Sequence, residues 1–175
     1  NKGTADQLFE EICRIAVKCG ELKGAWIGLV DPKAQQLRVV AAFGDLRGRL
    51  VSLGEPILEG SALPYQPARM VLGSGSHWLS NDLLDRATDD SDWQVLVATT
   101  GVRSCAAFPL KQGGTVIGAF SLYASEAEFF DLELVDLLNE MAADVSFAVD
   151  NFEREARHRR ADEALRASES WYRAL

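Results

Sequence analysis

The spacing of apolar and polar positions predicts two paired strands between residues 103 and 125. Arg103–Leu110 is mostly apolar, and Gln112–Gly114 supplies glycines that accept the positive φ angles of a hairpin turn. Thr115–Ala124 then forms a second run, rich in β-branched and aromatic residues. Neither run alternates apolar with polar side chains, as a strand with one face in water would. We therefore expect other elements to cover both faces of this hairpin.

A second hairpin and several short elements are predicted upstream. Ala25–Val30 and Leu37–Phe43 are apolar runs separated by a turn, so they should pair as antiparallel strands. Gly44–Gln66 contains four glycines and two prolines and predicts a long surface loop. The next segments predict a short helix, a brief strand and another short helix, over Pro67–Leu72, His77–Ser80 and Trp93–Thr100.

Helical spacing marks both ends of the chain. Leu8, Ile12 and Ile15 share one face of a predicted helix over Thr4–Gly20. From Asp131 onward the sequence has neither glycine nor proline for 45 residues, which as one helix would span about 68 Å. Apolar residues recur along this helix at a 4-3-4-3-4 spacing, which is typical of a coiled-coil seam and predicts a parallel homodimer. The seam comprises Leu134, Leu138, Met141, Val145, Ala148 and Phe152.

Past Phe152 this repeat breaks, because its next positions are Glu155, Arg159 and Asp162. A similar spacing resumes in a shifted register from Leu165 onward. The interruption indicates a weakly specified stretch of coiled coil, in which the helix register can change.

The order of the predicted elements is typical of an α+β fold. We expect one central antiparallel sheet, with the terminal helices on one face and the short helices and loops on the other. Residues 1–152 should form this domain, and residues 153–175 a helical linker into a following domain. Because the chain begins at Asn1 and ends within a helical pattern, we expect it to be part of a longer protein.

Composition and charge exclude several classes of function. The net charge of −8 argues against nucleic-acid binding, which needs clustered Lys and Arg. No run of 18 apolar residues is present, so no membrane segment is predicted in this stretch. The three cysteines, Cys13, Cys19 and Cys105, form no CxxC pair. That pattern suits a reducing compartment, and we expect the protein in the cytoplasm.

No residue pattern predicts catalysis or a metal site. Asp82–Asp92 contains five aspartates, but the spacing of a calcium loop is missing, so a solvated face is the better interpretation. A lone histidine such as His77 is more often a hydrogen-bonded residue than a haem ligand, and we expect no cofactor. The motifs GxSxG, GxxxxGK[ST] and HExxH are absent.

Aromatic residues on the predicted strands and short helices mark a candidate ligand cavity. On the strands they stand among small residues, and this alternation either leaves room beside a ring or reflects ordinary core packing. Both interpretations stay open. The candidate ligand-binding residues are Trp26, Phe43, Trp78, Trp93, Phe108 and Phe120.

Three segments together resemble the GAF domain family over nearly its full length: AWIGLVD, WQVLVATTGVRSCAAFPLKQGGTVIGAFSLYAS and FFDLELVDLLNEMAADVSFAVDNF. The VRS…PL…IG pattern and the end of the last segment are their most specific parts. The tail ARHRRADEALRASESWYRAL is similar to the helical linker that commonly enters a PAS domain in bacterial signalling proteins.

The resemblance implies a regulatory input module of bacterial signal transduction. Such modules are often dimeric through their terminal helices, and some bind a small effector between the sheet and the internal helices. The parent protein would then continue with a PAS domain and a histidine kinase, a diguanylate cyclase or a cyclic-di-GMP phosphodiesterase as output, in two-component or cyclic-di-GMP signalling.

Particular residues disfavour three GAF subgroups. The NKxxF signature of cyclic-nucleotide-binding members is missing, since the only Asn-Lys pair stands at the start of the chain. Bilin-binding members usually carry a Cys followed by His, whereas Cys105 is followed by Ala106. Sulfoxide reductases need cysteines gathered at the pocket, and we expect Cys13 and Cys19 behind the sheet. We thus expect a sensor or a ligand-free dimerisation module rather than an enzyme, with a thiol reductase as a remote alternative.

Overall fold

The structure, a computed structural model, describes residues 2–44, 56–57, 66–86 and 91–174. The elements over these residues follow the predicted order of helices and strands. They are α1 (Lys2–Gly20), β1 (Gly24–Asp31), β2 (Gln36–Gly44), β3 (Pro56–Ile57), α2 (Gln66–Ser74), β4 (Trp78–Ser80), α3 (Leu83–Arg86), α4 (Ser91–Thr100), β5 (Ser104–Gln112), β6 (Thr115–Ala124) and α5 (Leu132–Ala174).

The strands of the described residues form one sheet in the order β3-β2-β1-β6-β5-β4, and each adjacent pair is antiparallel. Both predicted hairpins are confirmed. In the second, Gln112 pairs with Thr115 across a turn in which Gly113 and Gly114 have φ angles of 57° and 82°. The predicted loop Gly44–Gln66 lies largely outside the described residues, apart from the short edge strand β3.

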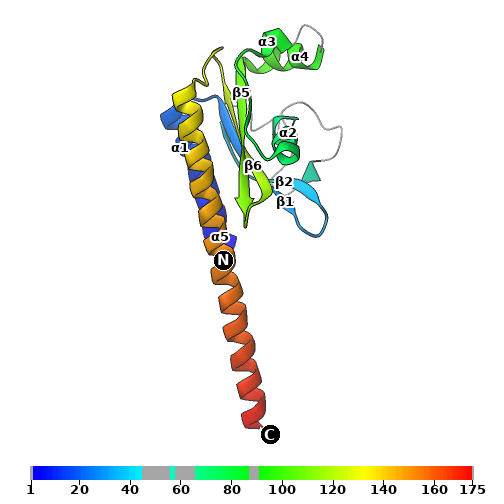
Figure 1. The fold of residues 1–175 in the computed structure, drawn as a ribbon, viewed down its shortest axis with the longest axis vertical. Helices are drawn as coiled ribbons and strands as arrows, with labels where there is room; N and C mark the ends of the chain where they lie inside the picture. The colour runs from blue at the N-terminus through cyan, green and yellow to red at the C-terminus, as the bar shows by residue number, and fades with distance from the viewer. Residues whose placement is uncertain (1, 45–55, 58–65, 87–90, 175) are drawn as a thin grey trace.

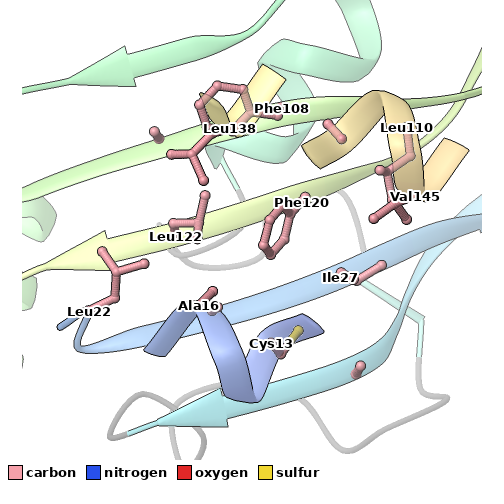
Figure 2. Packing of buried hydrophobic residues seen from close by; sticks show 14 of the residues in the cluster. Cys13, Ala16, Leu22, Ile27, Phe108, Leu110, Phe120, Leu122, Leu138 and Val145 are labelled. Atoms are coloured by element: carbon pink, nitrogen blue, oxygen red, sulfur yellow. The ribbon is translucent and has the colours of Figure 1, made fainter. Parts of the chain in front are cut away.

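The two terminal helices cover one face of the sheet, called here the terminal-helix face (Figure 1). α1 packs against β1 and β2, and α5 packs against β5. Figure 2 shows this core, in which Cys13 and Ala16 of α1 and Leu138 and Val145 of α5 meet strand residues such as Phe120. Full burial of a large apolar side chain here stabilises the fold by roughly 1.5–3 kcal/mol.

The opposite face, called here the internal-helix face, carries a second core. Ala68 and Val71 of α2 and Leu83 of α3 pack in one cluster with Trp26 and Tyr123 of the sheet. Each of these side chains is at most 1% exposed. The expected α+β architecture, with both sheet faces covered by helices, is therefore confirmed.

A β-bulge in β2 decides which face several of its side chains meet. Ile27 pairs with Ala41 while Gly28 pairs with Val39, so Val40 has no residue opposite it in β1. Strict alternation from Val39 would place Phe43 on the internal-helix face. The extra residue turns Phe43 to the terminal-helix face instead, where Lys18 Nζ lies 5.8 Å from the centroid of its ring.

The last part of α5 projects away from the domain as a single helix (Figure 1). Over residues 153–174 each side chain is exposed except that of Ala156, which is half-buried. Glu153 forms an ion pair with Arg160, and His158 Nε2 lies 3.8 Å from Asp162 Oδ2, so this segment makes polar contacts along its own length. None of the described helices is long and apolar enough to cross a membrane.

Candidate ligand-binding face

The candidate aromatic residues do not gather on one side of the sheet. Trp26 and Trp78 lie on the internal-helix face. Phe108 and Phe120 are paired across β5 and β6 and point to the terminal helices, where Phe43 also packs. A ligand between the sheet and the internal helices can therefore use only Trp26 and Trp78 of these five residues. The sixth candidate, on α4, is Trp93, whose side chain lies outside the described part of the structure.

The indole of Trp26 is fully buried at the middle of the internal-helix face. Its Nε1–H donates a hydrogen bond of 2.8 Å to the hydroxyl of Tyr123. The ring lies over Gly28, since a Cβ placed there would come within 2.6 Å of it. The small residue beside this tryptophan therefore makes room for the ring itself, and at this position the alternation reflects core packing.

Ser121 of β6 places a hydroxyl at the centre of the same face. It stands opposite Trp26 of β1 and Ala107 of β5. Because its chain neighbours Phe120 and Leu122 point to the terminal helices, Ser121 points to the internal helices. The residue is 1% exposed, and its Oγ has no hydrogen-bond partner among the residues that the structure describes. A buried hydroxyl without a partner costs roughly 1–3 kcal/mol.

Small apolar residues surround this hydroxyl. Ala119 and Ala107 are fully buried on the sheet, and Ala68 and Val71 of α2 belong to the same cluster. Ligand sites in proteins are mostly apolar with a few placed polar groups, and Ser121 among these side chains fits that description.

The described part of this face carries no fully buried charge. Its buried polar residues are the serines Ser80 and Ser121. Arg103 precedes β5 at the edge of this face, and its Nη2 donates to Asp82 Oδ1 at 3.2 Å. This ion pair offsets the charge of Arg103, whose Nε is buried without a hydrogen-bond partner among the described residues.

The cysteines do not form a reactive pair. Cys13 of α1 packs in the core of the terminal-helix face, and burial raises the pKa of its thiol to about 12. Cys105 is buried on the opposite face, and Cys19 is exposed. A thiol held in its neutral form is a poor nucleophile. The described residues also contain no group of three or more His, Cys, Asp or Glu side chains that could hold a metal ion.

The predicted coiled-coil seam is divided by the fold, and this corrects part of the predicted dimer interface. Leu138 and Val145 are each only 4% exposed and pack on the sheet of their own chain. They are therefore not available to a partner. The sequence spacing could not reveal this, because a helix face that packs on a sheet and one that packs on a second helix show similar apolar repeats.

A neighbouring ridge of α5 remains open to a partner. Leu134, Met141 and Phe152 of the predicted seam are half-buried, as is Ala148. Leu137, which the predicted seam did not include, is 52% exposed beside them. These five residues are called the α5 ridge below.

Sequence reasoning missed two residues of the internal-helix face. Tyr123, the hydrogen-bond partner of Trp26, was not among the candidates because its run is apolar on both sides of the strand. Ser121 did leave a signal, since it interrupts the otherwise apolar run AFSLYA with one hydroxyl. A polar residue within a strand that is covered on both faces is a candidate for a placed polar group.

Comparison with known families assigns the chain. The family model described as GAF domain matches residues 3–150. The chain belongs to the GAF domain family. The sheet with terminal helices on one face and short helices on the other is thus a GAF fold, as the sequence resemblance implied. GAF domains are commonly sensory or regulatory modules of signalling proteins. None of the curated proteins compared with it matches.

Solved structures support the fold. A GAF domain region from Geobacter sulfurreducens PCA superposes with a TM-score of 0.69 at 21% identity, covering 83% of this chain and 93% of the other. A domain of a protein described as a two-component sensor histidine kinase from Sinorhizobium meliloti 1021 gives a TM-score of 0.63 at 20% identity, covering 88% and 96%. The free methionine-R-sulfoxide reductase of Neisseria meningitidis gives 0.66 at 17% identity, covering 87% and 81%.

Proposed function

We propose that this GAF domain is a sensory input module that binds a small, uncharged molecule against the internal-helix face and relays binding through α5 to a following domain. The likeness to a domain of a two-component sensor histidine kinase protein supports a parent of that type, and a cyclic-di-GMP output entered through a PAS-like segment is the alternative that we keep. The three free cysteines support a reducing compartment such as the cytoplasm.

The observation that carries this proposal is the unpaired hydroxyl of Ser121. A buried polar side chain without a partner is uncommon in native proteins and calls for a reason. A ligand that hydrogen-bonds Ser121 Oγ would supply the missing partner and recover the desolvation cost of the hydroxyl. Trp26 and Tyr123, on the same face, offer aromatic surface beside it.

The surroundings of Ser121 define the ligand class. Apolar and aromatic side chains favour a compact, largely apolar molecule, and one hydroxyl favours a single hydrogen-bonding group on it. A phosphate or carboxylate would need basic partners, and Arg103, at one edge of this face, is already paired with Asp82.

Native mass spectrometry of the protein purified from its native host tests the proposal directly. We expect a reproducible small-molecule adduct, with Ser121→Ala retaining less of it. Ser104→Ala is the matched control, because Ser104 is also a fully buried strand serine, but its Oγ already donates to the carbonyl of Glu126 at 2.7 Å. The control should lose thermal stability and keep the adduct.

The two serine variants also separate a ligand site from a structural role. Replacing Ser121 removes an unsatisfied hydroxyl, so the unliganded variant should be as stable as the parent or more stable. If Ser121→Ala loses as much stability as Ser104→Ala, and no adduct appears in either, the ligand proposal fails.

A ligand-free dimerisation and relay module is the second candidate function. It is favoured by the dense packing of the internal-helix face, where Trp26, Val71 and Leu83 are fully buried. In both candidates we propose a parallel homodimer held by the α5 ridge and α1. A dimer without adduct would favour this second function. The separation of the cysteines, with Cys13 and Cys105 buried on opposite faces, weighs against the third possibility, a thiol reductase.

A further inference from the structure

Asn81, between β4 and α3, is bonded to the chain segment that precedes α5. Its side-chain Nδ2 donates to the carbonyl of Phe130 at 2.9 Å, and its Oδ1 accepts from the backbone N–H of Phe130 at 3.0 Å. Its own carbonyl accepts from the N–H of Glu128 at 2.7 Å. One residue thus makes three hydrogen bonds to a segment almost fifty positions further along the chain.

The residue that Asn81 holds sets the beginning of α5. Phe130 is 2% exposed and packs in one cluster with Val135, which is the residue pair of a hydrophobic staple. Asp131 between them is the N-cap, since its Oδ1 accepts from the N–H of Leu134 at 2.9 Å. The position of Phe130 therefore determines where the helix starts and in which direction it leaves.

On its other side Asn81 adjoins the internal-helix face. Leu83, two residues on, is fully buried in the cluster of Trp26, and its N–H donates to the carbonyl of Arg103 at 2.8 Å. Asp82 between them is fixed as well, because its Oδ1 accepts from the N–H of Leu84 at 3.0 Å. No flexible linker separates the core of this face from the contact with α5.

We propose that Asn81 is the positioning residue that couples the internal-helix face to the start of α5. A shift of Leu83 moves the adjoining backbone, and the paired bonds from one amide to Phe130 tolerate little displacement because hydrogen bonds weaken steeply when misaligned. The first turn of α5 must then follow or lose its anchor. That this shift is produced by a ligand rests on the proposed function, whereas the coupling itself does not.

Other described contacts between the short elements and α5 are weaker links. Asn139 of α5 meets His77, but through one contact of 3.4 Å between exposed side chains. The N–H of Lys111 donates to Ser146 Oγ of α5 at 2.9 Å, but this joins the tip of the β5–β6 hairpin rather than the covered face. Asn81 alone among these three combines paired bonds with a buried neighbour on the internal-helix face.

Amide hydrogen exchange of the purified protein tests the contact first. In Asn81→Ala the N–H of Phe130 loses its acceptor, so its exchange should accelerate about tenfold or more relative to the amides of β6. Asn139→Ala is the matched control and should leave Phe130 unchanged. Asn81→Leu also lacks the acceptor but keeps the side-chain volume, and it replaces the alanine variant if that protein does not fold. If the Asn81 variants accelerate amide exchange at Phe130 and in β6 equally, the proposed contact is overturned.

Coupling is tested by combining Asn81→Ala with Leu83→Ala and following the amide of Val135, which donates to the carbonyl of Asp131. Leu83→Ala should accelerate this exchange about tenfold relative to β6 when Asn81 is present, and by less than about twofold when it is replaced. If Leu83→Ala accelerates the exchange of Val135 equally with Asn81 and with Ala at position 81, the proposal is overturned. Leu83→Val gives the same comparison if the alanine variant is too unstable.

This experiment uses no ligand, so its failure and that of the sensor proposal are distinguishable. Non-additive exchange without any retained adduct would support the coupling and contradict the ligand. An adduct with additive exchange would do the opposite.

Discussion

Ser121 and Cys13 are both small residues with a polar side-chain atom, and they are buried on opposite faces of the sheet in different surroundings. Ser121 has an unsatisfied hydroxyl on the internal-helix face, where a ligand is proposed. Cys13 lies against the terminal-helix core, where a thiol behaves as a small apolar side chain. The desolvation that makes the first a candidate binding group makes the second chemically inert.

The thiol of Cys13 should make stability fall at alkaline pH. Its pKa is raised to about 12 in the fold, mainly by burial. The unfolded chain loses this proton near the ordinary value, so between these two pH values the folded state binds more protons and unfolding becomes easier as pH rises. The contribution approaches about 1.4 kcal/mol per pH unit.

Urea denaturation of the parent and of Cys13→Ala between pH 8 and 11 checks this, with the range chosen around the ordinary thiol pKa of about 8.5. We expect the parent to lose stability more steeply with pH than the variant, whatever their difference at pH 8. Cys19→Ala is the control, because Cys19 is exposed. Parallel curves for all three proteins would contradict the assignment.

At the scale of elements, α5 presents different sides to different neighbours. One stripe, which includes Leu138 and Val145, belongs to the core of the domain, while the α5 ridge beside it is partly open. Residues at adjacent positions of this helix therefore differ in whether they pack in the core or remain exposed to a partner. Leu137 and Leu138 are the sharpest example, with 52% and 4% of their surface exposed.

Leu137→Glu and Leu138→Glu should have different effects for this reason. The first should give a folded monomer, because a charge on the ridge opposes pairing without entering the core. The second should unfold the domain or cost several kcal/mol, because it buries an unpaired carboxylate. Sedimentation velocity combined with circular dichroism separates the two outcomes.

Leu132→Glu provides the control for this pair. Leu132 is 83% exposed and lies about 140° around the helix from Leu137, away from the ridge. It should leave both the fold and the oligomeric state unchanged. A Leu137→Glu protein that still sediments as a dimer would exclude the ridge as the interface.

At the scale of the whole molecule, α5 joins a packed domain to a projecting segment without interruption. Residues 153–174 bury almost no side chain against the domain, and their charges pair along the helix. The division predicted at residue 152 is therefore proposed as a boundary of stability rather than of secondary structure.

Shortening the chain tests this boundary. A protein that ends at Phe152 should melt within about 2 °C of the full chain, because little apolar area is lost. A protein that ends at Asp144 lacks Val145 of the core and should be much less stable. Thermal melts at several concentrations separate intrinsic stability from dimerisation. A large loss on removing residues 153–175 at every concentration would show that the segment belongs to the domain.

Much of the fold follows from local features of the sequence. The absence of Gly and Pro after Asp131 determined a long helix, and Gly113 and Gly114 determined the tight turn of the β5–β6 hairpin. The apolar character of both strand faces determined that helices must cover the sheet on both sides. These features depend on neighbours within a few residues, where backbone preferences and side-chain periodicity act directly.

Only the tertiary structure decided which face each side chain meets. Bulges at Val40 of β2 and at Ile117 of β6 each insert one residue, and one residue reverses the side to which a strand's side chains point. The first of them moves Phe43 away from Trp26. Sequence alternation cannot reveal this when both faces are apolar.

Long-range packing also decided which surface the apolar repeat of α5 packs against and which residue holds the start of this helix. Leu138 lies in the core because the sheet of its own chain, rather than a second helix, lies beneath it. Asn81 meets Phe130 across 49 positions of sequence. No local preference specifies such a contact, because it exists only once the sheet has brought the two segments together.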